Sequence, residues 1–445
     1  MIEDPLYGYK GELRKFLEKC NVKIGDRVRI IRKDLIVEGI LMPRAALSKR
    51  PYIVIKLDNG YNIGVRFTDK VKLAKVAEGE KLKKYTPSIK VEYNPKLPKV
   101  SIISTGGTIA SRVDYRTGAV YPALKTEDIL EFAPEIMNIA NIEAEVLFSI
   151  FSENMTPELW SRIAEEIAKK IWEGFDGIVV PHGTDTMSYT AAALAFALRN
   201  LPVPVVLVGS QRSSDRPSSD AAMNLYSAVL VAAKAPFAEV TVVMHGETAD
   251  VYCLVHRGTK VRKMHTSRRD AFRSINDKPL AKVEKDEIII INDHFKPRDK
   301  NRELILENKF DGKVALVKTH PGMSGEIIDF LVDKKYHGIV LEGTGLGHTP
   351  VYIFDSLKRA IEEGIPVVMT SQCLWGRINM NVYSTGRDLL AMGVIPGEDM
   401  LPEVALVKLM WVLAKTRNMD EVKKLMLTNI AGEINPRTMF STYLN

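Results

Sequence analysis

The chain is organised around one short stretch, Lys99-Val-Ser-Ile-Ile-Ser-Thr-Gly-Gly-Thr-Ile-Ala110. Residues 100–103 are β-branched or apolar apart from Ser101, which predicts a buried parallel strand. The two glycines that follow let the backbone turn sharply and let a ligand approach closely. Because ligands of open α/β sheets bind beyond the carboxyl ends of the strands, Thr108 stands where a reacting side chain is expected. The alternative is a plain strand-to-loop turn in which Thr108 bonds only to the backbone.

A second stretch has the same order of residue types, Asp176-Gly-Ile-Val-Val-Pro-His-Gly-Thr-Asp-Thr-Met187. An apolar strand is again followed by a glycine, a threonine (Thr184) and a carboxylate (Asp185). Strands and helices alternate from residue 100 onward, which predicts an α/β fold with a mainly parallel sheet. Asp220 is expected to cap the helix that begins near Ala221. A charged, aperiodic break over 292–308 precedes a shorter repetition of the pattern, which predicts a second, smaller α/β domain.

Length and composition narrow the class of protein. A chain of 445 residues is too long for one core and predicts two or three domains. Its 46% hydrophobic and 26% charged residues are typical of a soluble globular protein, and no apolar run is long enough for a membrane span. The three cysteines are scattered, and the chain shows no secretory signal, so we expect a cytoplasmic protein. The eight histidines lack metal-ligand spacing, so we expect no metal site.

The positive charge is concentrated at the N-terminus. Residues 1–98 hold 22 Lys and Arg against 12 Asp and Glu, whereas the remainder holds 40 against 43. Short strands between 27 and 67, with the hairpin turn Asp58-Asn-Gly60, predict a small β-barrel. We therefore expect a basic barrel at 1–80, a linker at 81–98, a larger α/β domain at 99–300, and a smaller α/β domain with a C-terminal tail at 301–445. The basic excess indicates either a surface that meets a polyanion or a solvated lysine-rich face.

The residues expected at strand ends suit acyl transfer from an amide or ester. A hydroxyl nucleophile needs a nearby base, and Tyr115 could serve Thr108 in that way. Lys263 with Asp185 could serve Thr184 or activate a water molecule. Backbone N–H groups in the two glycine turns could hold a developing oxyanion. Lys263 lies in a basic run, however, and the alternative is that this run is merely solvated.

TGGTIA at 105–110 and HGTDTM at 182–187 resemble the two signature motifs of the bacterial-type L-asparaginase/glutaminase family. The segments Gly209-Ser-Gln-Arg212, Leu341-Glu-Gly-Thr-Gly345 and Tyr383-Ser-Thr-Gly-Arg387 support the resemblance, which covers about 99–430. It implies two asparaginase-like α/β domains, pairing of the chain into a homodimer or tetramer, and active sites near the subunit interface. It also implies hydrolysis of the side-chain amide of asparagine or glutamine through a threonyl acyl-enzyme.

The resemblance assigns roles by position within the motifs. It makes Thr108 the first threonine, usually the nucleophile, with Tyr115 as its partner. Thr184, Asp185 and Lys263 then form the second catalytic group.

The same resemblance assigns the substrate-binding positions. Ser152 and Asp185 would hold the α-groups of the amino acid, and Gly107 and Gly183 would line the substrate site. One departure stands out, since the family commonly has Ser-Gln where this chain has Ser152-Glu153. Glu153 could therefore alter which amide is accepted.

The basic barrel ahead of the first motif is absent from free-standing asparaginases. The whole arrangement is similar to the glutaminase subunit of the archaeal amidotransferases that convert Glu-tRNA(Gln) to Gln-tRNA(Gln). That resemblance implies a homodimer joined to a partner E subunit as a heterotetramer. The partner would bind the tRNA and use ATP and Mg²⁺, while this chain would hydrolyse glutamine to ammonia.

Two features bear on this division of labour. The chain has no GxxxxGK[ST] phosphate loop and no GxGxxG after a strand, so we expect no cofactor in this chain. The alternatives are a free-standing cytoplasmic L-asparaginase with an added domain and a non-catalytic binding protein on the same scaffold. Whether the barrel contacts tRNA or only docks the partner is left open.

Overall fold

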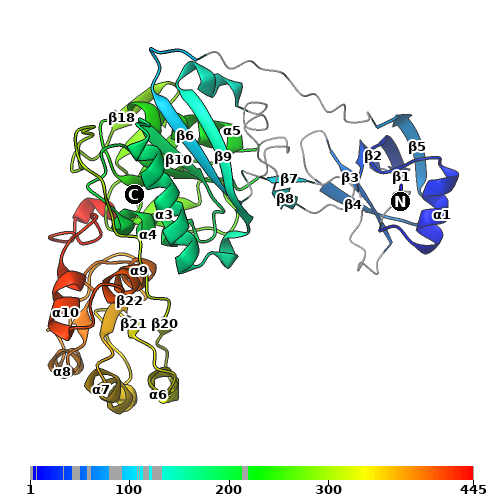
Figure 1. Ribbon diagram of the computed structural model, residues 1–445. Coiled ribbons are helices and arrows are strands. Elements are labelled where there is room, and N and C mark those ends of the chain that lie inside the picture. Colours follow the sequence, from blue (N-terminus) through cyan, green and yellow to red (C-terminus); the bar gives the residue numbers. More distant parts are fainter. Residues whose placement is uncertain are drawn as a thin grey trace.

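The computed structural model describes residues 4–6, 8–33, 35–42, 51–57, 62–79, 93–107, 109, 111–113, 120–122, 133–212 and 219–443. Thr108, Tyr115 and the basic loop at 44–50 lie outside these residues. Figure 1 shows three folded parts, namely an N-terminal β sheet, a larger α/β domain and a smaller C-terminal α/β domain. The expected boundaries at 80, 98 and 300 stay predictions, although strand β6 begins at Lys99 and strand β20 at Val314.

The N-terminal part is a five-stranded antiparallel sheet of order β4-β3-β2-β1-β5. Its elements are α1 (Gly11–Lys19), β1 (Arg27–Arg32), β2 (Leu35–Leu41), β3 (Tyr52–Lys56), β4 (Asn62–Arg66) and β5 (Lys72–Ala77). One face of the sheet packs on α1, because alternate strand residues such as Val28 and Ile30 are buried with Leu13 and Leu17. The expected β domain is therefore present. Among the described residues the pairings form this open order, with no pairing between β4 and β5.

The larger α/β domain is built on an eight-stranded sheet of order β18-β17-β14-β13-β12-β10-β6-β9. The strands are β6 (Lys99–Gly106), β9 (Asn141–Ile150), β10 (Gly177–Pro181), β12 (Val205–Val208), β13 (Val240–His245), β14 (Cys253–Arg257), β17 (Ala281–Glu284) and β18 (Glu287–Ile290). Strands β9, β6, β10, β12 and β13 are parallel to one another. Strands β14, β17 and β18 continue the sheet with antiparallel pairing. In this sheet β6, β10 and β12 are parallel neighbours, so the loops that follow their carboxyl ends lie side by side at one end of the strands.

Helices cover both faces of this sheet. Helix α5 (Ala221–Lys234) packs on the face that carries Val100 and Val179. Helices α3 (Pro157–Trp172) and α4 (Met187–Ala197) pack on the face that carries Ile178. The central strands β6, β10, β12 and β13 are nearly continuous apolar runs, because helices bury both of their faces. The remaining pieces are η2 (Pro134–Asn138), η3 (Ser152–Asn154) and the paired short strands β7 (Ser111–Val113) with β8 (Val120–Pro122), β11 (Leu198–Arg199) with β19 (Ile305–Leu306), and β15 (Val261–Lys263) with β16 (Phe272–Ser274).

The smaller domain has a four-stranded parallel sheet of order β20-β21-β22-β23. Its elements are β20 (Val314–Lys318), α6 (Glu326–Asp333), β21 (Gly338–Gly343), η4 (Val351–Ile353), α7 (Phe354–Glu362), β22 (Val367–Ser371), α8 (Ser384–Met392), β23 (Ile395–Pro396), α9 (Pro402–Leu413), α10 (Met419–Leu427) and η5 (Phe440–Thr442). Helix α9 lies between the two sheets (Figure 1). Its apolar residues share one core with Phe196 of α4 and Val340 of β21, so this helix joins the two α/β domains.

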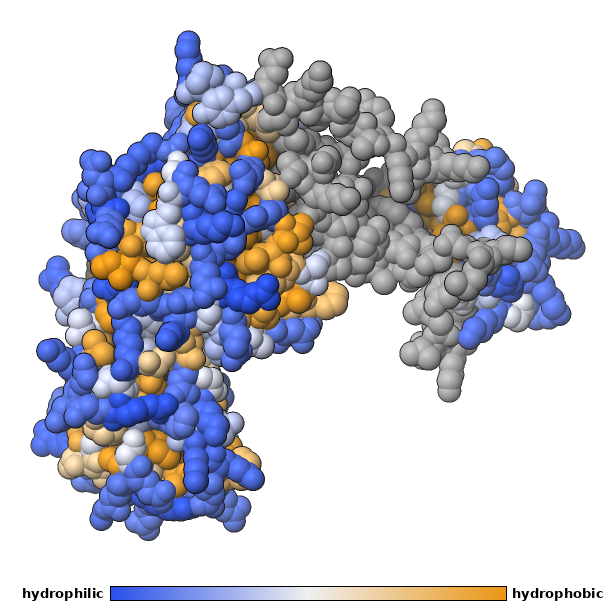
Figure 2. Space-filling view, in the orientation of Figure 1, coloured by the Kyte–Doolittle hydropathy of each residue, from blue (hydrophilic) through white to orange (hydrophobic). Residues whose placement is uncertain are grey.

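The surface and the helices bear on two expectations from the sequence. Within the described part of the chain, no helix combines the length and the apolar character that a bilayer span needs. Where residues are coloured by hydropathy, polar residues cover most of the visible face, and apolar residues gather in several smaller patches (Figure 2). Among these same described residues, no group of three His, Cys, Asp or Glu side chains is placed to hold a metal ion.

Candidate active site

The two glycine-containing motifs lie side by side at the carboxyl edge of the large sheet. Strand β6 ends in Gly106 and β10 ends in Pro181, and the two strands pair in parallel. Gly107 has a positive φ of 81°, and a Cβ atom at this position would lie 2.6 Å from the Cα of Gly183. Only glycine fits there, because a side chain would force the two backbones apart. The structure thus brings together Gly107 and Gly183 as the sequence analysis expected.

Thr184, Asp185 and Lys263 form one hydrogen-bonded cluster. The Lys263 Nζ donates to Thr184 Oγ1 at 2.8 Å and to Asp185 Oδ1 at 2.7 Å. Thr184 and Asp185 follow β10 directly, whereas Lys263 is the last residue of β15, 79 positions along the chain from Thr184. The lysine side chain is 12% exposed and the aspartate side chain 69% exposed, so the cluster opens to solvent on the side of Asp185. The basic run around Lys263 is therefore more than a solvated face.

The cluster has the parts of a proton relay. A lysine amine beside a threonine hydroxyl can take the hydroxyl proton or pass it to a water molecule. The Asp185 carboxylate accepts a hydrogen bond from Lys263 Nζ and so orients the lysine. The exposed carboxylate can also bind a cationic group of a ligand, such as an α-ammonium group.

Ser152 lies against the second motif. It opens the short helix η3 after β9 and is buried. A Cβ atom added to Gly183 would lie 2.6 Å from the Ser152 Cβ, which places the serine directly on the glycine turn. The Thr186 hydroxyl donates to the Ser152 carbonyl at 2.7 Å and ties η3 to the start of α4. Glu153, the departure from the family pattern, is exposed beside it.

His182 supports the turn from within and was not singled out by the sequence analysis. Its ring is fully buried, and burial lowers the pKa of His182 to about 4, so the imidazole is neutral. The Nδ1–H donates to the Gly183 carbonyl at 2.7 Å, and Nε2 then accepts from the Thr190 hydroxyl at 2.9 Å. The Trp160 indole N–H in turn donates to Thr190 Oγ1 at 3.0 Å. Nothing in the sequence spacing marks this chain of bonds, because its members come from α3, α4 and the motif.

The loop after β12 is held from behind. The Asp220 carboxylate accepts the backbone N–H groups of Gln211 and Arg212 at 3.0 to 3.1 Å. Its side chain makes no capping hydrogen bond to α5, so the expected role of Asp220 as a helix cap is wrong. The reason is competition for the same acceptor, because two N–H groups of the preceding loop already occupy it. Asn224 adds a bond to the Gly209 carbonyl at 2.9 Å and fixes the loop further.

Thr108 and Tyr115 lie outside the described residues, so the pairing expected between them stays a prediction. Gly107, the residue before Thr108, is buried against the second motif. Of the candidates named from the sequence, the described residues bring together Gly107, Gly183, Thr184, Asp185 and Lys263, with Ser152 on the glycine turn and Glu153 beside it.

Known protein families match the domains of this chain. The family model described as "Asparaginase, N-terminal" matches residues 99–296, and the model described as "Glutaminase/Asparaginase C-terminal domain" matches 313–426. A third model, described as "GatD N-terminal domain", matches 22–76. A curated relative from Pyrococcus abyssi, named as the D subunit of glutamyl-tRNA(Gln) amidotransferase, is 58% identical over 97% of this chain and 99% of its own length. A relative of the same name from Thermococcus kodakarensis is 54% identical over 98% of this chain and 100% of its own length.

The chain belongs to the family of glutamyl-tRNA(Gln) amidotransferase D subunits. Solved structures resemble the part with the asparaginase-like fold. The thermostable L-asparaginase from Thermococcus kodakarensis is 37% identical with a TM-score of 0.68, and it covers 76% of this chain and 99% of its own. The L-asparaginase I from Vibrio cholerae is 32% identical with a TM-score of 0.67, over 76% of this chain and 99% of its own. The resemblance and the fold class expected from the sequence are thereby confirmed.

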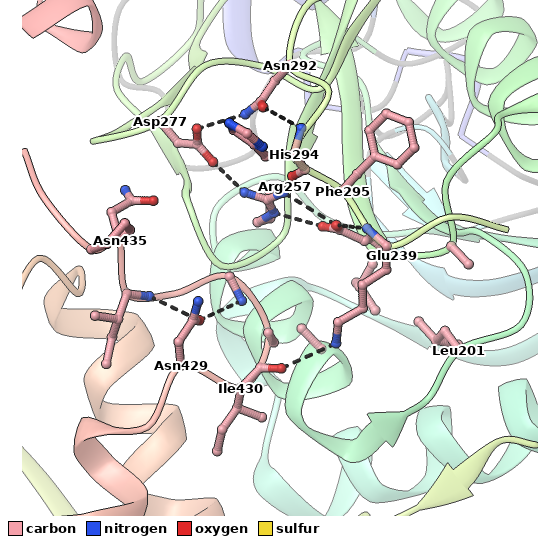
Figure 3. A pocket seen from close by; sticks show the side chains of 18 of the residues that line it. Leu201, Glu239, Arg257, Asp277, Asn292, His294, Phe295, Asn429, Ile430 and Asn435 are labelled. Carbon is pink, nitrogen blue, oxygen red and sulfur yellow. Dashed lines mark hydrogen bonds and ion pairs between the residues drawn. The ribbon is translucent and has the colours of Figure 1, made fainter. Parts of the chain in front are cut away.

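A cavity of about 700 Å³ lies at the opposite end of the large sheet from Thr184 and Lys263 (Figure 3). It is bordered by Val240, the first residue of β13, and by Arg257, the last residue of the antiparallel β14. Each nitrogen of the Arg257 guanidinium is already bonded, with Nε on Glu239 at 2.8 Å, Nη1 on Asp277 at 2.5 Å and Nη2 on the His294 carbonyl at 2.5 Å. The C-terminal tail closes one side, where the Ile430 carbonyl accepts from Lys296 Nζ at 3.3 Å. The polar groups drawn here bond mainly to one another.

Proposed function

We propose that this chain is the glutaminase subunit of a tRNA-dependent amidotransferase that converts Glu-tRNA(Gln) to Gln-tRNA(Gln). The observation that carries the proposal is the match to relatives named as amidotransferase D subunits over 97% of the chain, including its N-terminal β domain. The alternative, a free-standing L-asparaginase, does not account for that domain, because the solved L-asparaginases cover 76% of the chain.

The first half-reaction forms an ester on a threonine. Thr108 attacks the side-chain amide carbon of glutamine while Tyr115 takes the hydroxyl proton. The negative charge on the carbonyl oxygen is stabilised by backbone N–H groups of the two glycine turns, which lie together at Gly107 and Gly183. Tyr115 passes this proton to the amide nitrogen, the C–N bond breaks, and ammonia leaves a glutamyl ester behind.

The second half-reaction hydrolyses this ester. Lys263, with Thr184 and Asp185 at 2.8 and 2.7 Å, relays a proton from a water molecule as the water attacks the ester carbon. Glutamate departs and Thr108 regains its proton, so that glutamine and water yield glutamate and ammonia. The alternative assignment, in which Thr184 attacks first, uses the same cluster in the first step.

Substrate binding uses the residues around the second motif. The exposed Asp185 carboxylate suits the α-ammonium group of the amino acid, and Ser152 suits its α-carboxylate. Glu153 follows Ser152 at the mouth of this region and shifts the preference between glutamine and asparagine.

The remaining parts of the reaction belong to a partner. Two copies of this chain pair through their asparaginase-like domains, and each binds an E subunit to give a heterotetramer in the cytoplasm. The E subunit makes most of the contacts with the tRNA and uses ATP and Mg²⁺ to activate the glutamyl ester. This chain binds no cofactor and delivers ammonia.

The first test measures ammonia release from glutamine and from asparagine. The chain is assayed alone and with its E subunit, Glu-tRNA(Gln) and ATP. Glutamine turnover that rises with the full set supports an ammonia source coupled to tRNA. Fast asparagine hydrolysis by the isolated chain, unchanged by partner and tRNA, would instead identify a free-standing asparaginase.

A second test separates ammonia production from its use. Thr108→Ala and Thr184→Ala in the complex are expected to abolish glutamine-dependent transfer but to leave transfer from added ammonium intact. Thr416→Ala, at a threonine in the smaller domain, is the matched control and is expected to keep both activities. Loss of both activities in the Thr184→Ala complex would contradict the role assigned to Thr184.

A further inference from the structure

The short strand that carries Lys263 has two faces with different partners. Side chains alternate across a strand, so Val261 and Lys263 of β15 point one way and Arg262 points the other, while Lys260 directly precedes the strand. Val261 is buried in the core that also contains Met187 of α4. Lys263 reaches Thr184 and Asp185 on the same side. This face of β15 therefore belongs to the catalytic cluster.

Two ion pairs tie this segment to the smaller domain, one from Arg262 on the opposite face of β15 and one from Lys260 just before the strand. Lys260 Nζ lies 2.8 Å from Asp399 Oδ2, and both side chains are buried. Arg262 Nη1 lies 2.9 Å from Glu403 Oε2, whose carboxylate is also buried. Asp399 follows β23, and Glu403 is in the first turn of α9. Arg262 of β15 and Lys260, which directly precedes the strand, thus both bond to the smaller domain.

The Lys260–Asp399 tie is reinforced by other bonds. The Asp399 carboxylate also accepts the backbone and side-chain N–H groups of Asn435 at 2.9 Å. The Asn276 side chain donates to the Asp399 carbonyl at 3.2 Å, so a residue that lies just after β16 reaches the same point. Burial raises the pKa of Glu403, and Arg262 counters this shift by favouring the carboxylate.

Helix α9 also packs against α4, the helix that follows Thr184 and Asp185. Thr184 and Asp185 lead into α4, which begins at Met187. Phe196 of α4 packs in one core with Trp411 of α9, with ring centroids 5.9 Å apart. The same helix therefore fixes α4 through apolar packing and β15 through Glu403.

We propose that the Arg262–Glu403 and Lys260–Asp399 pairs position the catalytic lysine, so that the smaller domain sets the distance from Lys263 Nζ to Thr184 Oγ1. Arg262, Glu403, Lys260 and Asp399 are positioning residues, because they act through Lys263. The proposal rests on the proposed glutaminase activity. A strand of three residues is short enough to shift as a unit, so loosening its outward face moves the lysine on its inward face.

The test compares Glu403→Gln with a control at a similarly buried pair. Lys408 and Glu433 lie 2.6 Å apart with both side chains fully buried, but their hydrogen bonds are within α9, the end of α10 and the tail. Glu403→Gln in the full complex is expected to lower kcat for glutamine hydrolysis about 10-fold, because small displacements of a catalytic group are costly. Its KM is expected to stay within about 2-fold, because substrate-binding groups are untouched. Glu433→Gln is expected to lower the Tm and leave kcat unchanged.

A double-variant cycle adds a readout that simple destabilisation does not produce. Arg262→Met combined with Glu403→Gln is expected to lose no more kcat than Arg262→Met alone, because both changes break the same tie. Asp399→Asn is expected to lower kcat in the same sense as Glu403→Gln. An unchanged kcat in Glu403→Gln, or an equal loss in Glu433→Gln, would overturn the proposal.

Crystal structures of the same variants separate this inference from the proposed function. In Glu403→Gln the distance from Lys263 Nζ to Thr184 Oγ1 is expected to lengthen beyond the 2.8 Å seen here, and in Glu433→Gln it is expected to stay. If the wild-type complex hydrolyses no glutamine, the proposed function fails while the distance still decides the positioning role. An unchanged distance in Glu403→Gln, with active wild type, rejects the positioning role alone.

Discussion

The two ends of the large sheet are both polar, but they use their polar groups differently. At the carboxyl end, Lys263 bonds to Thr184 and Asp185 while the aspartate stays 69% exposed. At the amino end, Arg257 is shared between Glu239 and Asp277 in a setting where all three side chains are buried or nearly so. The carboxyl end keeps charged groups available to a ligand, whereas the amino end pairs them off.

The comparison teaches that a cavity alone does not indicate a site. The cavity of about 700 Å³ lies at the amino end, where each nitrogen of its arginine is already bonded to the protein (Figure 3). The cluster suited to chemistry lies at the carboxyl end, where parallel strands β6, β10 and β12 direct three loops to one place. We therefore expect substitutions at one end to affect catalysis and substitutions at the other to affect stability.

The largest effect is expected from removing the lysine at the carboxyl end. Lys263→Met is expected to lower kcat for glutamine hydrolysis by about 10²–10⁴-fold, the usual contribution of a general acid or base. The measurement is steady-state ammonia release by the complex. Lys358→Met, at an exposed lysine of α7, is the matched control and should leave kcat unchanged. A Lys263→Met enzyme with near-normal kcat would remove the distinction between the two ends.

At the amino end the expected effect is on stability. Arg257→Met leaves the Glu239 and Asp277 carboxylates without their partner, which is expected to lower the free energy of unfolding by about 3–5 kcal/mol. Urea unfolding measures this loss, and kcat measured well below the Tm should stay within about 2-fold of wild type. Arg359→Met is the control, because that arginine also pairs with carboxylates but is 41% exposed, so its loss should cost much less stability than that of Arg257. A kcat that fell in step with stability would place function at both ends.

Glycine substitutions sharpen the comparison within the carboxyl end. Gly107→Ala must push against the backbone of Gly183 and is expected to lower kcat by up to about 100-fold, because it separates the two motifs. Gly174→Ala is the matched control, since Gly174 has a similar φ of 86° but open space around it. That control should cost only the strain of the backbone, about 1 kcal/mol, with kcat unchanged. Equal effects in both variants would show that strain, and not the contact between motifs, is responsible.

The last effect concerns pH. The pKa of buried His182 is about 4 against an ordinary value of 6.5, so between these values the unfolded chain binds a proton that the folded chain does not. The free energy of unfolding should therefore fall by up to about 1.4 kcal/mol for each pH unit from 6.5 toward 4 on account of this histidine. His182→Gln removes this group, so the slope of the free energy of unfolding against pH should fall by up to about 1.4 kcal/mol per pH unit. Urea unfolding between pH 4.5 and 7 measures the slope. His294→Gln, at a side chain that is 92% exposed, serves as the control, and equal slopes in the two variants would show that His182 does not titrate as described.

Much of the site was predictable because local sequence encodes it. Apolar strand residues followed by glycine, threonine and aspartate specify a loop at the carboxyl end of a strand, whatever surrounds them. The role of Asp220 was not predictable in the same way, since an aspartate before a helix has two sets of N–H groups within reach. Here the preceding loop takes the carboxylate, and the helix end does without it.

By itself the sequence determined the α/β alternation, the two glycine motifs and the family, because these depend on residue types and spacings along the chain. Only the tertiary structure decided which distant groups meet. It brought Lys263 to Thr184, it paired Lys260 and Arg262 with carboxylates of the smaller domain, and it paired Arg257 with two buried carboxylates. The physical reason is that a charged side chain is satisfied by whichever partner the packing of helices and sheets brings within about 3 Å, and no spacing in the sequence records that distance.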